Sequence, residues 1–176
     1  MTRPTLLVTR RLPPPVLQEA CRVFDLRLWE RDEPIGDDFE DWARNRDAVL
    51  VMATDRLDRV RLHALAAGGA RAIATYSVGY DHIDLDAASA CGLPVFNTPD
   101  VLSDAVAEIA LFLILAAARG TTGHEATLRE GRWGPWSPTL FLGRQLTGLR
   151  LGIFGMGRIG RAIAQRAAGF GLHLHY

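Results

Sequence analysis

Short apolar runs alternate with segments of helical spacing along the first hundred residues. The runs have the length of buried strands, and the segments between them place apolar side chains three or four positions apart. Strands are predicted at residues 6–9, 26–29, 48–52, 72–76 and 95–97, and helices at residues 15–24, 37–45, 58–67 and 84–91. This alternation is typical of an α/β domain with a doubly wound parallel sheet and helices on both faces.

Residues at the ends of the predicted helices support these boundaries. Asp37 and Asp58 lie where a carboxylate at the N-cap can accept hydrogen bonds from the first helical turn. Gly68 and Gly92 lie where two helices are expected to stop. The first hundred residues are therefore predicted to form one compact domain.

The pattern changes after this domain. An apolar helix is predicted from residue 103 or 104 to 119, followed by a more polar helix at residues 121–131. Because the first is apolar almost all round, we expect it to be covered on several sides, between domains or against a second subunit. Residues 133–138 contain Trp133, Trp136 and two prolines, which predict a loop. Its aromatic side chains either hold the loop together or contact a partner chain.

A glycine motif follows the apolar run at residues 149–154, which is predicted to be a buried parallel strand. Gly155, Gly157 and Gly160 form G-x-G-x-x-G just before a helical pattern. Gly155 would allow the tight turn, Gly157 would let the backbone approach a pyrophosphate, and Gly160 would let helix and strand pack closely. Free N–H groups of the first helical turn would then face the phosphates. The alternative is a glycine turn that binds nothing.

Composition excludes several function classes. Twenty basic side chains balance twenty acidic ones, which disfavours nucleic acid and anionic membranes as partners. Cys21 and Cys91 lack the spacing of a disulfide framework or a metal site. The apolar run at residues 105–118 contains Glu108 and is shorter than the roughly 18 residues of a membrane span. The N-terminus has no signal-like apolar stretch, so we expect a cytoplasmic protein.

Four motifs in this order closely resemble the D-isomer-specific 2-hydroxyacid dehydrogenases, and among them the glyoxylate and hydroxypyruvate reductases. They are ATYSVGYDHID at residues 74–84, PVFNTP at 94–99, VLSDAVAE at 101–108 and GMGRIG at 155–160. The resemblance implies a flavodoxin-like doubly wound substrate-binding domain at residues 1–98. It also implies that residues 99–176 hold an interdomain helix and the start of a Rossmann dinucleotide-binding domain.

The same resemblance implies site residues. Backbone amides of Val78 and Gly79 would hold the substrate carboxylate, and Gly157, Arg158, Ile159 and Gly160 would meet the pyrophosphate of NAD(P), with NADPH favoured. A simple strand-to-helix turn at Ser77–Asp81 and a solvated Arg158 remain the alternatives. His82, at a position that is often Asn, is expected to be an ordinary turn residue, and Glu108 to be paired with backbone or an arginine.

The catalytic Arg, Glu and His of that family would come after Tyr176, and the sequence stops within the first half of a dinucleotide-binding domain. We therefore expect no catalytic residue in this chain and expect it to be truncated. The function implied is NAD(P)-dependent reduction of a small 2-oxo acid, such as glyoxylate or hydroxypyruvate, to the D-2-hydroxy acid by a homodimer. The alternative is a non-catalytic protein of the same descent that binds small acids or dimerises.

Overall fold

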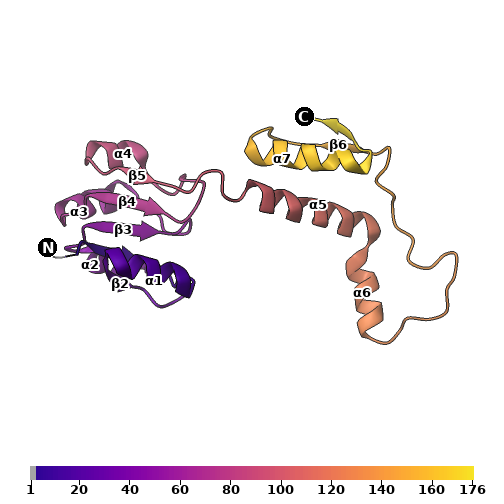
Figure 1. Cartoon of the computed structure of the whole chain (residues 1–176), viewed down its shortest axis with the longest axis horizontal. Helices are drawn as coiled ribbons and strands as arrows, with labels where there is room; N and C mark the ends of the chain where they lie inside the picture. Colours follow the sequence, from indigo (N-terminus) through magenta and orange to yellow (C-terminus); the bar gives the residue numbers. More distant parts are fainter. Residues whose placement is uncertain (1–2) are drawn as a thin grey trace. The chain divides into compact units, whose positions relative to one another are not determined.

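The computed structural model describes residues 3–176, which divide into two compact units. The first ends at Pro99 and the second runs from Asp100 to Tyr176 (Figure 1). Each unit has its own parallel sheet, of five strands in the first and two in the second.

The first unit is built on strands in the order β2-β1-β3-β4-β5. Their bounds are β1 (Thr5–Val8), β2 (Asp25–Leu28), β3 (Ala48–Val51), β4 (Ala72–Thr75) and β5 (Val95–Phe96). Every predicted strand of this unit is present close to its expected bounds. This is the strand order of doubly wound flavodoxin-like folds, so the predicted fold class is confirmed.

Helices cover the two faces of this sheet unequally. They are α1 (Pro14–Val23), the 3-10 turn η1 (Gly36–Asp38), α2 (Phe39–Ala43), α3 (Arg59–Ala67) and α4 (Leu85–Ala90). Side chains alternate along a strand, so Leu7 packs with α2, α3 and α4 on one face, while Leu6 and Val8 pack with residues near α1 on the other. The larger core lies on the face with three helices.

Two of the three acidic residues near helix starts cap helices. The side chain of Asp58 accepts a hydrogen bond from the backbone N–H of Arg61 at 3.0 Å, and Asp84 accepts one from Ala87 at 2.9 Å. The prediction for Asp37 is wrong. Gly36, with φ of 65°, already begins the turn, so Asp37 lies inside η1 and cannot take the extended backbone of an N-cap.

The second unit contains α5 (Ser103–Arg119), α6 (Thr121–Arg129), β6 (Arg150–Gly152), α7 (Arg158–Ala167), the 3-10 turn η2 (Ala168–Phe170) and β7 (His173–His175). Strands β6 and β7, which precede and follow α7 in the sequence, pair in parallel with Leu151 opposite Leu174. This β-α-β arrangement is the predicted opening of a dinucleotide-binding fold. Helix α5 packs along α7 (Figure 1).

Burial in the second unit is incomplete within the described residues. On α5, Ala107 and Leu111 are buried, but Phe112 is 63% exposed, so within residues 3–176 the helix is covered on one side only. Glu108 is exposed and makes no hydrogen bond or ion pair to the other described side chains. The strand predicted to be buried at residues 149–154 is shorter, and it is partly exposed. Its sheet has only two strands, so few neighbouring residues are available to cover it.

The aromatic loop before β6 is held by a residue that the sequence did not suggest. Trp133 stacks on Phe141 with ring centroids 4.6 Å apart, and Phe141 meets the His124 ring edge-on at 4.5 Å. Trp136 is 84% exposed. Only one of the two tryptophans therefore helps to fix the loop.

Hydropathy gives no single helix within residues 3–176 that is long and apolar enough to cross a membrane. Helices α5 and α6 are long and apolar enough only when taken together, and they bend by 72° where they join.

Candidate functional site

Three successive carbonyl groups of the loop that follows β4 accept hydrogen bonds from other groups of the first unit. The carbonyl of Ser77 accepts a hydrogen bond from the N–H of Thr98 at 3.0 Å, and that of Val78 accepts one from the side-chain amide of Asn97 at 2.9 Å. The carbonyl of Gly79 accepts one from the Ser77 hydroxyl at 2.7 Å. In a trans peptide the C=O and N–H point in opposite directions, so the N–H groups that follow these carbonyls point away from the three donors.

Those N–H groups belong to Val78, Gly79 and Tyr80, and we call them the carboxylate cradle. None of them donates a hydrogen bond to another residue within 3–176. Gly79 and Tyr80 are exposed, and Val78 is half-buried. Successive free backbone N–H groups are suited to binding an anion. The predicted roles of Val78 and Gly79 therefore have a physical basis here, and Tyr80 adds a donor that sequence reasoning missed.

Gly79 is not required by the local fold. A β-carbon built on it would meet only Oδ2 of Asp81, at 3.7 Å, which is an ordinary contact distance. The absence of a side chain leaves space beside the free N–H groups, as an approaching anion would need.

A buried carboxylate braces the same edge of the sheet. Asp55, which is 4% exposed, accepts hydrogen bonds from the hydroxyl of Thr9, from the N–H of Met52 at 2.9 Å and from Arg10 at 3.0 Å. Thr9 follows β1 and Met52 follows β3, so Asp55 ties together the loops at the carboxyl ends of two neighbouring strands. Ligands of open α/β sheets bind at this edge.

The loop containing Asp55 also supports the loop that carries the cradle. Leu57 donates its N–H to the carbonyl of His82 at 2.8 Å and accepts from the N–H of Asp84 at 3.0 Å. The β3–α3 connection is thereby joined to the β4–α4 connection.

His82 is more than the ordinary turn residue expected from the sequence. Its Nε2 lies 3.0 Å from the hydroxyl of Thr75, which lies 2.6 Å from the hydroxyl of Ser77. Burial lowers the pKa of His82 below its ordinary value, and the carboxylates of Asp55 and Asp81 oppose that shift. Sequence reasoning missed Thr75, because a threonine at the end of a strand does not indicate a role in a site until its hydrogen-bond partners are known.

The glycine motif forms a turn between β6 and α7. Gly155 has φ of 100°, a conformation that favours glycine. Gly157 is the N-cap residue of α7, where no side chain caps the helix, and a β-carbon on it would meet no atom within 4 Å. The first N–H groups of α7 have no helical acceptor, so they and the open space at Gly157 suit a phosphate group.

Arg158 lies beside a carboxylate at the start of α7, and its expected contact with the pyrophosphate stays a prediction. Its Nε lies 2.7 Å from Oδ1 of Asp100, and both side chains are more than half exposed. Asp100 also has a positive φ, of 65°. The guanidinium therefore sits at the start of α7 with a carboxylate already beside it.

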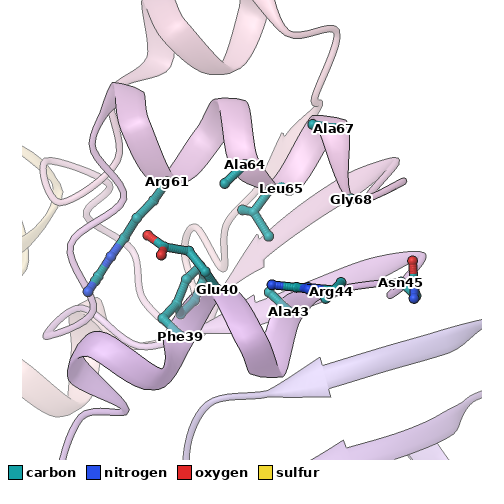
Figure 2. A pocket seen from close by; sticks show the side chains of 10 residues that line it. All are labelled: Phe39, Glu40, Ala43, Arg44, Asn45, Arg61, Ala64, Leu65, Ala67 and Gly68. Atoms are coloured by element: carbon teal, nitrogen blue, oxygen red, sulfur yellow. The ribbon is translucent and has the colours of Figure 1, made fainter.

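Two other hollows in the first unit have a weaker claim to function. One, of about 370 Å³, lies between α2 and α3, where Figure 2 shows Arg61 and Arg44 along its sides. Both arginines are occupied: Arg61 donates to the carbonyl of Gly36 at 2.7 Å, and Arg44 pairs with Asp41 at 2.9 Å. The other is an apolar groove of about 490 Å³ on the sheet, bordered by Phe24 and Phe96. Within residues 3–176, no three metal-ligating side chains gather.

Comparison with known proteins agrees with these features. Residues 6–170 match the family model of the D-isomer specific 2-hydroxyacid dehydrogenase catalytic domain. The chain belongs to this family.

Relatives in the D-2-hydroxyacid dehydrogenase family cover nearly the whole chain. The glyoxylate reductase of Thermococcus litoralis is 39% identical over 180 residues, which are 99% of this chain and 54% of that protein. A structure from Polaromonas sp. JS6 66, described as a D-isomer specific 2-hydroxyacid dehydrogenase, NAD-binding, has a TM-score of 0.90 and 45% identity over 100% of this chain and 55% of that one. A glyoxylate reductase from Paecilomyes thermophila has a TM-score of 0.78 and 27% identity, covering 99% of this chain and 55% of its own. The chain spans about half the length of the curated relatives it matches.

Proposed function

We propose that this chain supplies the substrate-carboxylate site and the first part of the cofactor site of an NAD(P)H-dependent reductase acting on small 2-oxo acids such as glyoxylate or hydroxypyruvate. The observation that carries the proposal is the carboxylate cradle, whose three N–H groups are free while the carbonyls that precede them accept hydrogen bonds from Thr98, Asn97 and Ser77. The relatives named glyoxylate reductase support the choice of substrate class.

The cradle would bind and orient the substrate through its carboxylate. Each hydrogen bond from a backbone N–H to a carboxylate is worth about 1.5–3 kcal/mol when the group is shielded from water. Donors spaced along one loop also fix the direction in which the acid lies, and so the direction in which its 2-oxo carbon faces.

The second unit would hold the cofactor. Gly157 and the first N–H groups of α7 fit a pyrophosphate, since no atom lies within 4 Å of a β-carbon placed on Gly157. Bound NAD(P)H supplies the hydride that reduces the 2-oxo carbon. The pyrophosphate would compete with Asp100 for Arg158. The preference for NADPH over NADH rests on the subfamily resemblance and stays a prediction.

The acid–base step needs a group that can give a proton to the carbonyl oxygen. His82 is committed to Thr75, and His63 lies beside Cys91 on the surface. We propose, as the family resemblance implies, that this step uses residues outside this sequence.

Dimerisation and a cytoplasmic location are part of the proposal. On α5, Ile109, Phe112 and Leu113 are all more than half exposed, as is Trp136 in the loop after α6. An apolar helix side of this kind suits contact with a second copy of the chain.

The alternative function is that of a non-catalytic protein that binds small acids. A nicotinamide fluorescence titration distinguishes this alternative from the reductase. NADPH and NADH are titrated against the wild-type protein and against Gly157→Val, and NADPH oxidation is followed after addition of glyoxylate. The reductase account predicts saturable binding of NADPH to the wild-type protein and loss of that binding in Gly157→Val. It predicts oxidation of NADPH by glyoxylate only in a protein that also carries the acid–base residues. Binding of glyoxylate without any binding of NADPH or NADH would favour the small-acid binder.

A further inference from the structure

Counting protons fixes the direction of the hydrogen bonds behind the carboxylate cradle. The carbonyl of Gly79 can only accept, so the single hydroxyl proton of Ser77 is used on it. Ser77 must then accept from Thr75, whose own proton is used in that bond. Thr75 must therefore accept from His82, and Nε2 of His82 must carry a proton.

We propose that His82 is a positioning residue of the carboxylate cradle: its Nε2–H starts a chain of hydrogen bonds through Thr75 and Ser77 that fixes the orientation of the Gly79 carbonyl. The N–H of Tyr80 belongs to the same peptide group as that carbonyl, so the chain directs this N–H toward the substrate carboxylate. The inference rests on the proposed function and adds Tyr80 to the donors of the cradle.

Burial strengthens the first two links of this hydrogen-bond chain. Thr75 is 1% exposed, so its hydroxyl has no water to replace a lost protein donor. If His82 cannot donate, the Thr75 oxygen loses the donor that fixes the direction of its hydroxyl group. The hydrogen bonds at Ser77 and at the Gly79 carbonyl then also lose their fixed direction, because linked hydrogen bonds polarise and orient one another.

The other cradle donors do not depend on His82. The carbonyls of Ser77 and Val78 are held by Thr98 and Asn97, neither of which bonds to His82 or Thr75. A change at His82 is therefore expected to act on the Tyr80 N–H and to spare the N–H groups of Val78 and Gly79. General damage to the loop would affect all three.

The test compares ¹⁵N-labelled wild-type protein with His82→Phe, His82→Gln and Ser77→Ala in titrations with glyoxylate. Phenylalanine keeps the ring but has no donor, whereas the glutamine amide places an N–H close to the position of Nε2. We expect His82→Phe to weaken glyoxylate binding about tenfold, the loss of one hydrogen bond to a charged group, and to remove the glyoxylate-induced shift at Tyr80 alone. His82→Gln should restore both.

Ser77→Ala breaks the same chain at its other end, so the double variant with His82→Phe should bind no more weakly than either single variant. Wild-type affinity and an unchanged Tyr80 shift in His82→Phe would overturn the inference, as would additive losses in the double variant.

A direct reading of the imidazole serves if His82→Phe does not fold. Nitrogen NMR of the wild-type protein should show a protonated Nε2 and an unprotonated Nδ1 in the neutral ring, and an unprotonated Nε2 contradicts the chain. Failure of the proposed function gives a different result: the wild-type protein would show no glyoxylate-induced shift at Val78 or Gly79, whatever the state of His82.

Discussion

The carbonyl oxygen of Gly155 occupies the space that a β-carbon on Gly160 would need. That β-carbon would also lie 3.2 Å from the carbonyl carbon of Gly155 and 3.4 Å from Cγ2 of Ile153. The third glycine of the motif therefore lets α7 begin against its own turn, whatever the turn binds. Gly157 has open space around it, so the local fold does not explain why it lacks a side chain.

Gly160→Ala and Gly157→Ser should separate these two roles. Gly160→Ala should lower the free energy of unfolding by about 1–3 kcal/mol, since the backbone must shift to admit the methyl group. Gly157→Ser should leave it nearly unchanged, because serine is a favoured N-cap residue, while weakening NADPH binding. Urea denaturation and nicotinamide fluorescence measure the two effects. An unchanged urea midpoint for Gly160→Ala would contradict the geometry.

Asp55 should be among the most sensitive charged positions in the first unit. Asp55→Ala leaves Arg10, Thr9 and the Met52 N–H without their shared acceptor in a site where Asp55 itself is 4% exposed. Removal of one member of a buried pair costs about 3–5 kcal/mol. The matched control is Asp41→Ala, since Asp41 pairs with Arg44 on the surface and should cost less than about 1 kcal/mol. Equal losses for the two variants in urea denaturation would show that Asp55 does not brace the sheet edge.

His82 should make stability depend on pH in a defined direction. Its pKa in the folded protein lies below the ordinary 6.5 because of burial, against the opposing carboxylates of Asp55 and Asp81. The unfolded chain therefore binds the proton more readily, and stability is lost as pH falls below about 6.5 toward the folded pKa. Relative to His82→Gln, the wild-type protein should lose stability over that range and not above it. Thermal melts of both proteins at a series of pH values measure this difference, and a relative gain for wild type at low pH would refute it.

Gly79→Ala tests the space beside the cradle. The new methyl group meets only Asp81, at an ordinary distance, so folding should be retained. It would crowd the approach of a carboxylate to neighbouring N–H groups, and we expect glyoxylate binding to weaken about tenfold, a cost of about 1.4 kcal/mol. Gly134→Ala is the control, since it also has open space around it but lies in the loop after α6. Equal glyoxylate affinity in the two variants would place the anion elsewhere.

Sequence reasoning succeeded where the signal is local and repeated. Strands β1 to β5 and the cap at Asp58 follow from spacing within a few residues. Asp37 was misjudged because the positive φ of Gly36 starts the turn early, which spacing cannot reveal.

The parts that sequence reasoning missed depend on partners far apart in the chain. Asp55 meets Thr9 across 46 residues, and Asn97 meets Val78 across 19. Asp55 belongs to none of the four motifs, and the motif that contains Asn97 does not reveal its partner. What covers the exposed side of α5 stays a prediction for a similar reason, since an apolar helix indicates that something can cover it but not what does so.

The most direct test of the central claim is the map of amide shifts that glyoxylate induces in the wild-type ¹⁵N-labelled chain. The account predicts saturable shifts that are largest at Val78, Gly79 and Tyr80, with little change at the start of α7. Largest shifts at α7, or none in the loop after β4 at any glyoxylate concentration, would contradict the assignment of this loop as the carboxylate site.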